Sequence, residues 1–356
     1  MGTKVGWKKL VPLLILLLAS AVVLTVSRVK IPCIYYYEQM HAAERMMKAF
    51  PLLSAYEGTL QDNIDAINDP NRTGLIGMEF NEMTTTIGVL SAKRTSTNPD
   101  FAALLVGFIH KLGLRTGDRI VLTVSGSFPA LNLAAIIACE ELGLKMLIIS
   151  SVGASSFGAN RPEMTWLDME SLLRKHGIIF HSTDIASLGA ENDLGDSYFE
   201  GGKALAQATI ERNGLTPLIM ETAEGQRRAK LEAIKRFHPK ALINVGGNQL
   251  NVGSKGHLLS PGIIRTTSVD HKDLGMIGYA LDHNISVIHL LKIRDLALEF
   301  GLPIDPIPLP LPGNSPVYYR THIHWPWAAA LLTPTLLYII FLVYDRQKKI
   351  RKRSMR

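Results

Sequence analysis

Three loops rich in glycine, serine and asparagine carry the residue types that could bind or attack a small anion. They cover residues 125–132, 150–160 and 244–249, and each follows a predicted strand. Glycine lets a ligand approach the backbone closely, and a helix that begins after such a loop directs N–H groups at an anion. The expected guest is a carboxylate or phosphate, although each loop alone is also typical of an ordinary strand-to-helix turn. The residues expected to bind it are Ser125, Gly126, Ser127, Asn132, Ser151, Gly153, Ser155, Asn244, Gly246 and Gly247.

A second chemical candidate is the set of Ser127, Asp168 and His181, which follows the chain order of the catalytic residues in α/β-hydrolases. The nucleophile elbow of those enzymes needs a glycine two residues before and two residues after the serine, whereas serine and proline stand there. We therefore expect Ser127 to cap the following helix rather than to attack a substrate. Asp168 is expected to close a capping box with Thr165.

Acidic residues and histidines elsewhere have simpler interpretations. An acidic stretch surrounds two glycines and is expected to be a solvated loop rather than an acid/base or cation-binding site. Its members are Asp184, Glu191, Asp193 and Asp196. His322 and His324 lack a third ligand nearby, so we expect no metal site. The sequence identifies no cofactor.

The central region alternates between apolar, β-branched runs and helical patterns. This alternation predicts a parallel, Rossmann-like sheet with helices on both faces, and ligands bind such sheets at the carboxyl ends of the strands. A further helical pattern covers residues 35–66. The predicted strands are residues 119–125, 145–151, 177–180, 217–220, 241–245 and 285–290, and the predicted helices between them are residues 129–142, 202–212 and 224–237.

Both ends of the chain contain an apolar run without a charge, 17 residues at 10–26 and 18 residues at 327–344. We expect each run to be a transmembrane helix. Ten basic residues flank the two runs against one acidic residue, which gives the ends a charge of +9 and, by the positive-inside rule, places both termini in the cytoplasm. The middle keeps 28 of the 38 basic and 30 of the 31 acidic residues, a balance of −2, so nucleic acid is not an expected partner.

The composition is that of a folded chain, with 47% hydrophobic and 19% charged residues, which excludes disordered and collagen-like classes. We expect the middle to lie on the outer side of the membrane. Cleavage after residues 19–21 is a weaker alternative to an uncleaved anchor. The expected segments are an anchor (1–27), a membrane-proximal helical cap (28–95), an extracytoplasmic α/β domain (96–302), a proline-rich connector (303–326), a transmembrane helix (327–344) and a basic cytoplasmic tail (345–356).

Several motifs together resemble a bacterial family, the poly-gamma-glutamate system proteins. The resemblance spans about residues 74–253, and the serine-rich octapeptide at 125–132 is its most distinctive part. It implies a role beside the ligase and membrane subunits that make and export poly-γ-glutamate, and it carries over no catalytic residue. The motifs that carry it are residues 93–100, 117–118, 125–132, 150–155, 165–170 and 244–247.

We therefore expect an accessory component of poly-γ-glutamate synthesis or export that is anchored in the bacterial cytoplasmic membrane and acts as a scaffold or handles the polymer. The synthase membrane subunits, the γ-glutamyl polymer and membrane lipid are its expected partners. A middle region at −2 exerts no general attraction on a polyanion, so any contact should be local to the three loops. Two alternatives stay open: a hydrolase or transferase that acts on the polymer through Ser127 or the acidic loops, and a sensor of a small carboxylate.

Overall fold

The computed structural model describes residues 7–26, 28–60, 66–323 and 325–354, so His324 of the histidine pair lies outside the described residues. The chain divides into two compact units. Residues 34–318 form the larger one, which we call the body. Residues 1–33 and 319–356 form the other, which we call the terminal unit.

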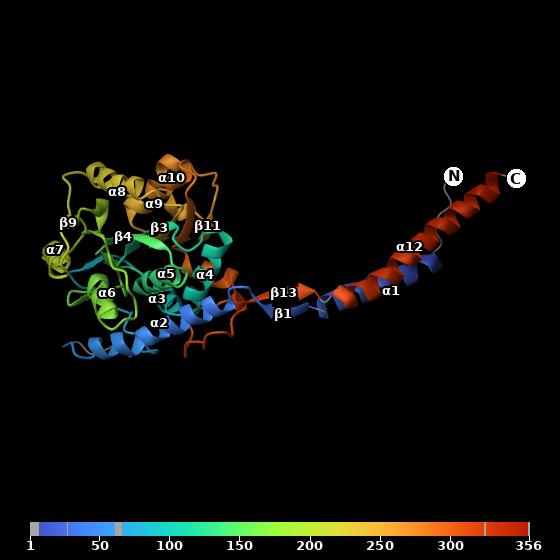
Figure 1. Ribbon diagram of the computed structural model, residues 1–356, viewed down its shortest axis with the longest axis horizontal. Coiled ribbons are helices and arrows are strands. Elements are labelled where there is room, and N and C mark those ends of the chain that lie inside the picture. Colours follow the sequence, from blue (N-terminus) through green and yellow to red (C-terminus); the bar gives the residue numbers. More distant parts are fainter. Residues whose placement is uncertain (1–6, 27, 61–65, 324, 355–356) are drawn as a thin grey trace. The chain divides into compact units, whose positions relative to one another are not determined.

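The body is a mixed α/β structure built on a seven-stranded sheet (Figure 1). The strand order is β11-β12-β10-β3-β4-β8-β9, and all neighbours are parallel except β11 and β12. Its strands are β3 (Arg119–Ser125), β4 (Lys145–Ser151), β8 (Ile185–Ser187), β9 (Pro217–Leu218), β10 (Ala241–Val245), β11 (Gly262–Ile264) and β12 (Ser286–Leu290).

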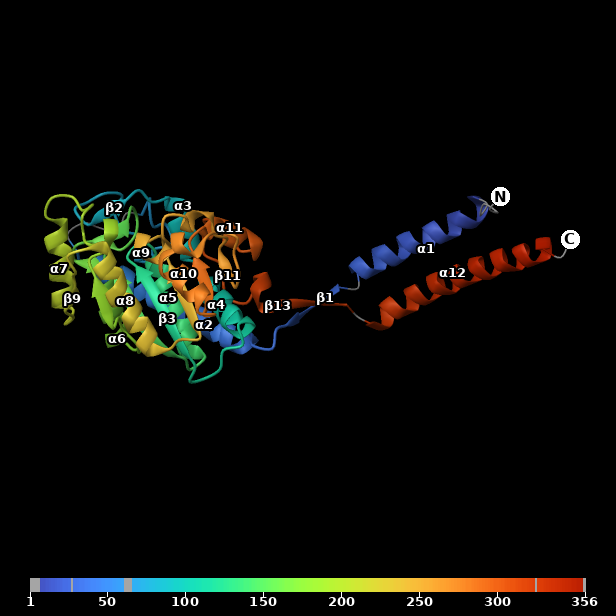
Figure 2. The ribbon, with the colours of Figure 1, turned by 90° about the horizontal axis from the view of Figure 1, so that it is seen from above.

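Helices cover both faces of this sheet. One face packs against α2 (Tyr36–Glu57), α4 (Asp100–Lys111), α5 (Pro129–Glu141) and α6 (Trp166–Lys175). The opposite face packs against α8 (Ala223–Phe237) and α10 (Gly275–Asp282), the side from which Figure 2 is seen. The remaining helices of the body are α3 (Leu90–Ser96), α7 (Gly202–Arg212), α9 (Gln249–Val252) and α11 (Ile293–Glu299), with 3-10 turns η1 (Glu191–Asp193), η2 (Gly256–Leu258), η3 (His271–Asp273) and η4 (Pro316–Tyr318).

The central strands are apolar on both sides because both sides are covered. In β3, Ile120 and Leu122 belong to the core beneath α4 and α5, whereas Val121 belongs to the core beneath α8 and α10. Successive side chains of a strand point to opposite faces, so a continuous apolar run is the pattern that double burial requires. Short paired strands join the loops around the sheet: β2 (Thr84–Thr86) with β5 (Ala154–Ser155), and β6 (Asn160–Arg161) with β7 (Met164–Thr165).

Two predicted elements differ from the structure. Residues 177–180 form no strand; Gly177 ends the turn after α6 with a φ of +67°, and the strand at this place in the sheet is β8, at Ile185–Ser187. The helix predicted for residues 35–66 is α2, at Tyr36–Glu57, and it packs on α4 and α5 within the core of the body. Residues 61–65 of that predicted helix lie outside the described residues.

The described residues of the terminal unit form two helices and a two-stranded ribbon. The helices are α1 (Trp7–Val26) and α12 (Trp325–Ser354), and Ser20 Oγ of α1 lies 3.2 Å from Thr335 Oγ1 of α12. The strands β1 (Arg28–Pro32) and β13 (Tyr319–Ile323) pair antiparallel.

The predicted transmembrane helices are wrong. Among the residues that the structure describes, none of the helices combines the length and the apolar character that a membrane crossing requires. The runs of 17 and 18 residues lie at the short end of the roughly 17–25 apolar residues that a span needs. Each also contains a proline, Pro12 in α1 and Pro334 in α12, and α12 continues through a basic segment. The assignments that depended on these spans, a cytoplasmic-membrane location with cytoplasmic termini and an outer domain, are corrected with them.

Candidate active site

A cavity of about 530 Å³ opens at the carboxyl ends of the central strands. The chain continues from β3 to β4 and β8 on one side of β3 and returns later to β10 and β12 on the other. The loops after β3 and β10 therefore diverge, and open α/β sheets bind ligands in the crevice that such divergence leaves. In Figure 2, β2, α3 and α9 gather at this edge of the sheet. The lining includes Lys93, Ser125, Ser127, Gly153, Ser155 and Gly247.

Lys93 reaches the cavity from α3 with its amine buried. The residue is 2% exposed, and its Nζ donates hydrogen bonds to Ser155 Oγ at 2.6 Å and to the Ser127 carbonyl oxygen. The same atom lies 3.9 Å from the centroid of the Phe128 ring. No carboxylate in the described part of the chain pairs with it, and burial lowers the pKa of Lys93 to about 7. The amine is therefore partly neutral near pH 7, unlike an exposed lysine.

The strand pair β2 and β5 places Ser155 beside this amine. Ser155 ends β5, and its backbone N–H donates to Ser127 Oγ at 3.1 Å. Gly88, which follows β2, makes the close approach possible. A Cβ at Gly88 would lie 2.4 Å from the Ser156 carbonyl oxygen and 3.1 Å from both Lys93 Cε and Ser155 Oγ. Only glycine lets this backbone approach the lysine and serine so closely.

The pairing of a buried, partly neutral amine with a serine hydroxyl is an arrangement for nucleophilic catalysis. A serine hydroxyl is a weak nucleophile until a neighbouring base takes its proton. The base must lie within hydrogen-bond reach and have a pKa near the working pH, and Lys93 meets both conditions toward Ser155. The geometry therefore supports Ser155 as a nucleophile and Lys93 as its general base.

Ser127 does not have the capping role predicted for it. The cap residue of α5 is Phe128, which makes no side-chain cap hydrogen bond, and Pro129 is the first helical residue. Ser127 Oγ instead accepts the hydrogen bond from the Ser155 backbone. Its own hydroxyl hydrogen has no acceptor among the hydrogen bonds of the described residues. Ser127 thus lines the cavity as a hydroxyl donor next to Ser155.

The structure does not bring Asp168 and His181 to Ser127. Asp168 closes the capping box of α6, as the sequence predicts, with its carboxylate accepting from Thr165 N at 2.8 Å. It also pairs with Arg212. His181 is bound to Glu140 through Nδ1 at 2.8 Å. Neither residue lines the cavity, so the hydrolase-like triad does not form.

The other residues predicted to bind a ligand fall into two groups. Ser125, Gly153 and Gly247 line the cavity together with Ser127 and Ser155. The rest do not line the cavity, and each takes part in hydrogen bonds within the fold. Asn132 Nδ2 donates to the Ser125 carbonyl oxygen at 2.8 Å, Asn244 Nδ2 donates to the Gly246 carbonyl oxygen at 2.8 Å, the Gly126 N–H donates to the Ser151 carbonyl oxygen at 3.0 Å, and Ser151 Oγ donates to Asp193 at 2.9 Å.

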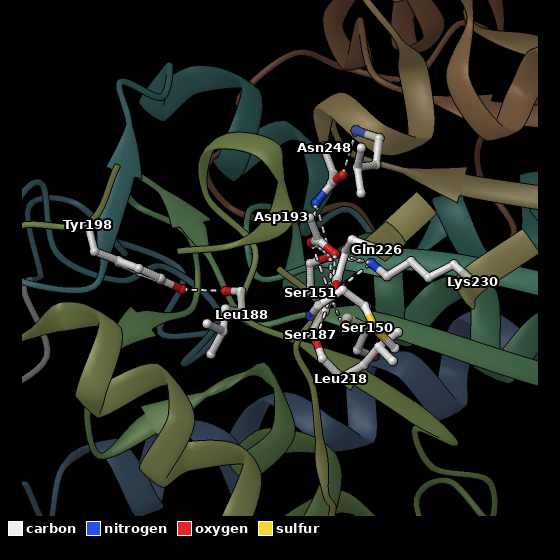
Figure 3. Close-up of polar contacts among 12 residues, drawn as sticks. Ser150, Ser151, Ser187, Leu188, Asp193, Tyr198, Leu218, Gln226, Lys230 and Asn248 are labelled. Carbon is white, nitrogen blue, oxygen red and sulfur yellow. Dashed lines mark hydrogen bonds and ion pairs between the residues drawn. The ribbon is translucent and has the colours of Figure 1, made fainter. Parts of the chain in front are cut away.

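A fully buried ion pair lies behind one wall of the cavity (Figure 3). Lys230 Nζ of α8 and Asp193 Oδ2 of η1 are 2.6 Å apart, and neither side chain is exposed. Gln226, Ser151 and Ser187 donate further hydrogen bonds to the Asp193 carboxylate. Burial alone would raise the pKa of Asp193, but the Lys230 charge and these hydrogen bonds hold it below its usual value. The prediction of a solvated acidic loop is therefore wrong at Asp193.

This network reaches the cavity through Asn248, which lines it. Asn248 Nδ2 donates to Ser151 Oγ at 3.0 Å and to Asp193 Oδ1 at 2.9 Å. The η1 segment that carries Asp193 is strained, with positive φ angles of +60° at Ala190, +56° at Asn192 and +61° at Asp193. Such a backbone persists when its surroundings fix it, and here the ion pair provides that fixation. Ala190 also lines the cavity, so the network holds part of its wall.

Sequence reasoning missed Lys93 and the pair of Asp193 with Lys230 as site residues. In the sequence, Lys93 is only the first residue of one motif of the resemblance, because none of the residues next to it in the chain indicates that it is buried. Asp193 stands among other acidic residues, and Lys230 lies in a helix rich in charge, so both look solvent-exposed in the sequence. Comparison with protein-family models and with curated proteins finds no match to this chain. The resemblance to the poly-gamma-glutamate system proteins therefore stays a prediction.

Proposed function

We propose that this protein is an acyl-transfer enzyme, a hydrolase or transferase of an ester or amide, that uses Ser155 as nucleophile and Lys93 as general base. One observation carries the proposal: Lys93 Nζ lies 2.6 Å from Ser155 Oγ inside a cavity, with no carboxylate in the described part of the chain to hold it charged. Like the enzymatic alternative open from the sequence, this is a hydrolase or transferase, but it uses Ser155 in place of Ser127 and is not tied to the γ-glutamyl polymer.

The proposed reaction proceeds in two steps. Neutral Lys93 takes the hydroxyl proton as Ser155 Oγ bonds to the substrate carbonyl carbon, and the resulting ammonium returns the proton to the leaving group as its bond to that carbon breaks. Water or another nucleophile then attacks the acyl-serine, with Lys93 again carrying the proton. The Ser127 hydroxyl is suited to donate to the oxyanion that develops on the carbonyl oxygen.

Covalent labelling with a fluorophosphonate tests this proposal. We expect a single adduct on Ser155, found by mass spectrometry of the digested protein, and no adduct on the Ser155→Ala variant. The labelling rate should rise with pH through about 7, because the neutral amine is the active form. Lys93→Met should slow labelling by about 10²-fold or more, the usual contribution of a general base.

Matched variants make the labelling result specific. Lys175 is exposed at the end of α6 and Ser91 lies on α3 outside the cavity lining, so Lys175→Met and Ser91→Ala should label at the wild-type rate. Ser127→Ala should keep the adduct on Ser155 but slow its formation by about 10-fold or more through loss of an oxyanion donor. An adduct on another serine, or an unchanged rate in Lys93→Met, would contradict the proposal.

The accessory role in poly-γ-glutamate synthesis or export, with the synthase subunits and the polymer as partners, is supported only by the sequence resemblance. Gene deletion in a polymer-producing host, with rescue by Ser155→Ala, tests it separately. Loss of polymer on deletion with full rescue by the variant would favour a scaffold over the enzyme. Altered polymer length with the variant would favour the enzyme.

A further inference from the structure

The side chains that line the cavity are not of the kind that would bind a polyanion. We propose that the substrate is a small ester or amide whose acyl group is uncharged and apolar, with its alkyl part against Ile87, Val89 and Leu291. The inference rests on the acyl-transfer function proposed above and adds the substrate class. It also separates the site from the γ-glutamyl polymer that the sequence resemblance suggests.

The apolar part of the lining comes from residues near β2, α3, α5 and β12. Ile87 and Val89 follow β2, Ala92 and Phe128 stand beside Lys93, and Leu291 follows β12. Ile87 is 84% exposed and Val89 58% exposed, although both are large apolar side chains. Transfer of such surface from water to an alkyl group is favourable, at about fourfold in affinity per buried methylene.

The charged part of the lining is small. Of the residues that line the cavity, all within the described part of the chain, only Lys93 and Glu191 carry ionisable acidic or basic side chains. The Lys93 amine already donates to Ser155 and to the Ser127 carbonyl oxygen, and its proposed role needs it neutral. Glu191 is exposed at the wall and repels an anion. Apart from Lys93, the described residues of the lining offer no cation to bind a substrate carboxylate.

A γ-linked glutamyl chain carries a free carboxylate on each residue. Placing one in this cavity would take charges out of water without a partner, which is costly. The cavity volume of about 530 Å³ lies in the range typical of small-molecule sites. Neutral polar side chains of the lining, Ser127 and Gln249, remain to orient the ester or amide group. Size, charge and apolar lining thus agree on a compact neutral acyl compound.

Two measurements test the substrate class. In the Ser155→Ala variant, which cannot form an adduct, calorimetric titration should show hexanamide binding at least 10-fold more tightly than acetamide and more tightly than γ-glutamylglutamate. In the wild type, kcat/KM for p-nitrophenyl esters should rise from acetate to hexanoate by a similar factor, and γ-glutamyl p-nitroanilide should be a poorer substrate than hexanoyl p-nitroanilide.

A matched pair of surface variants locates the alkyl subsite. Ile87 lines the cavity and Leu298 of α11 does not, and both are largely exposed, so an aspartate at either position should leave the fold intact. Ile87→Asp should reduce the preference for hexanoate over acetate to about threefold or less. Leu298→Asp should keep the wild-type preference.

The possible outcomes distinguish the substrate class from the acyl-transfer function on which it rests. Fluorophosphonate labelling of Ser155 without any acyl-length preference would overturn the substrate class and leave the acyl-transfer function standing. Tighter binding of γ-glutamylglutamate than of hexanamide to Ser155→Ala would also overturn the substrate class, whether or not esters are turned over. Binding of hexanamide without fluorophosphonate labelling of Ser155 would support the apolar subsite and contradict the acyl-transfer function.

Discussion

Lys93 is an unusual residue because its amine is buried without a carboxylate partner among the residues that the structure describes. Burial in a region of low polarity disfavours the charged form, so the folded protein holds this amine less basic than the unfolded chain does. The hydrogen bonds to Ser155 and to the Ser127 carbonyl oxygen, together with the Phe128 ring, replace part of the lost hydration. A lysine kept in this state costs folding free energy at neutral pH, which favours a catalytic over a structural explanation.

The Lys93→Met variant should therefore change how stability depends on pH. The pKa of Lys93 is about 7 in the folded protein, against 10.5 for an unperturbed lysine, so between these values the unfolded chain binds the extra proton. The free energy of unfolding of the wild type should therefore increase as the pH rises through this range, by about 5 kcal/mol at most. This gain is lost as the pH falls back to 7. Urea denaturation of wild type and Lys93→Met at pH 7, 8.5 and 10 measures the difference.

Lys175→Met, which removes an exposed lysine outside the cavity, is the control for this experiment. Parallel pH profiles for wild type and Lys93→Met would show that the pKa of Lys93 is not lowered by folding.

At the scale of single residues, the sequence predicts roles that depend on neighbours in the chain and misses those that depend on distant ones. The capping box of Thr165 and Asp168 is local and is present. The partner of Ser127 Oγ is the Ser155 backbone, 28 residues away, and this long-range contact is what replaces the predicted helix cap. Burial of Lys93 has no local signal at all, because any helix can carry a lysine on either face.

At the scale of elements, the ion pair of Asp193 and Lys230 connects five segments around one carboxylate. Its hydrogen-bond partners come from β4, β8, α8 and the residue before α9. A buried pair of this kind gains little over an apolar replacement, but loss of one partner leaves an uncompensated buried charge. The pair therefore explains how a segment with three positive φ angles keeps its shape beside the cavity.

A double-mutant cycle measures this coupling. Asp193→Asn and Lys230→Met should each lower the free energy of unfolding by about 3–5 kcal/mol, and the double variant should lose less than the sum of the two. The exposed pair of Asp196 with Lys203, 3.5 Å apart, provides a parallel cycle that should show a coupling of about 0–1 kcal/mol. Additive losses in the buried pair would contradict the proposed coupling. Urea denaturation at pH 7 gives all the required values.

The elements themselves are predicted best where the strand is long and apolar. The runs at residues 119–125, 145–151 and 241–245 coincide with β3, β4 and β10. β8 is three residues long and contains the buried Ser187, whose hydroxyl contacts the ion pair. A strand so short and partly polar has too little periodicity to be recognised. The nearby residues 177–180 are more apolar, so the sequence predicts the strand there instead of at β8.

At the scale of the whole molecule, part of the proline-rich segment is bound to the helix that carries Lys93. The Arg94 guanidinium of α3 forms a two-pronged pair with the Asp305 carboxylate, and the Asp305 N–H donates to Thr95 Oγ1 at 2.9 Å. Asn71 Nδ2 donates to the Pro306 carbonyl oxygen at 2.8 Å. Residues expected to form a simple connector thus fasten α3 in place.

Removal of this attachment should loosen α3 selectively. Asp305→Asn should lower the hydrogen-exchange protection of amides in α3 by a factor of about 5–30, which corresponds to about 1–2 kcal/mol for a charged hydrogen-bonded pair. Amides of β3, in the centre of the sheet, should keep their protection. Asp282→Asn, which removes the exposed partner of His271, is the control and should leave α3 unchanged. Equal loss of protection in α3 and β3 would mean global destabilisation instead.

The order of strands in the sheet has a consequence for how the protein is made. β3 lies in the centre, but its neighbour β10 follows about 120 residues later, with Thr123 opposite Asn244. The cavity wall is complete only with Leu291, after β12. A chain emerging from the ribosome therefore cannot assemble the pocket until most of the body has been synthesised, and such distant pairings form slowly. Nascent chains with Lys93 and Ser155 already present still lack a finished site.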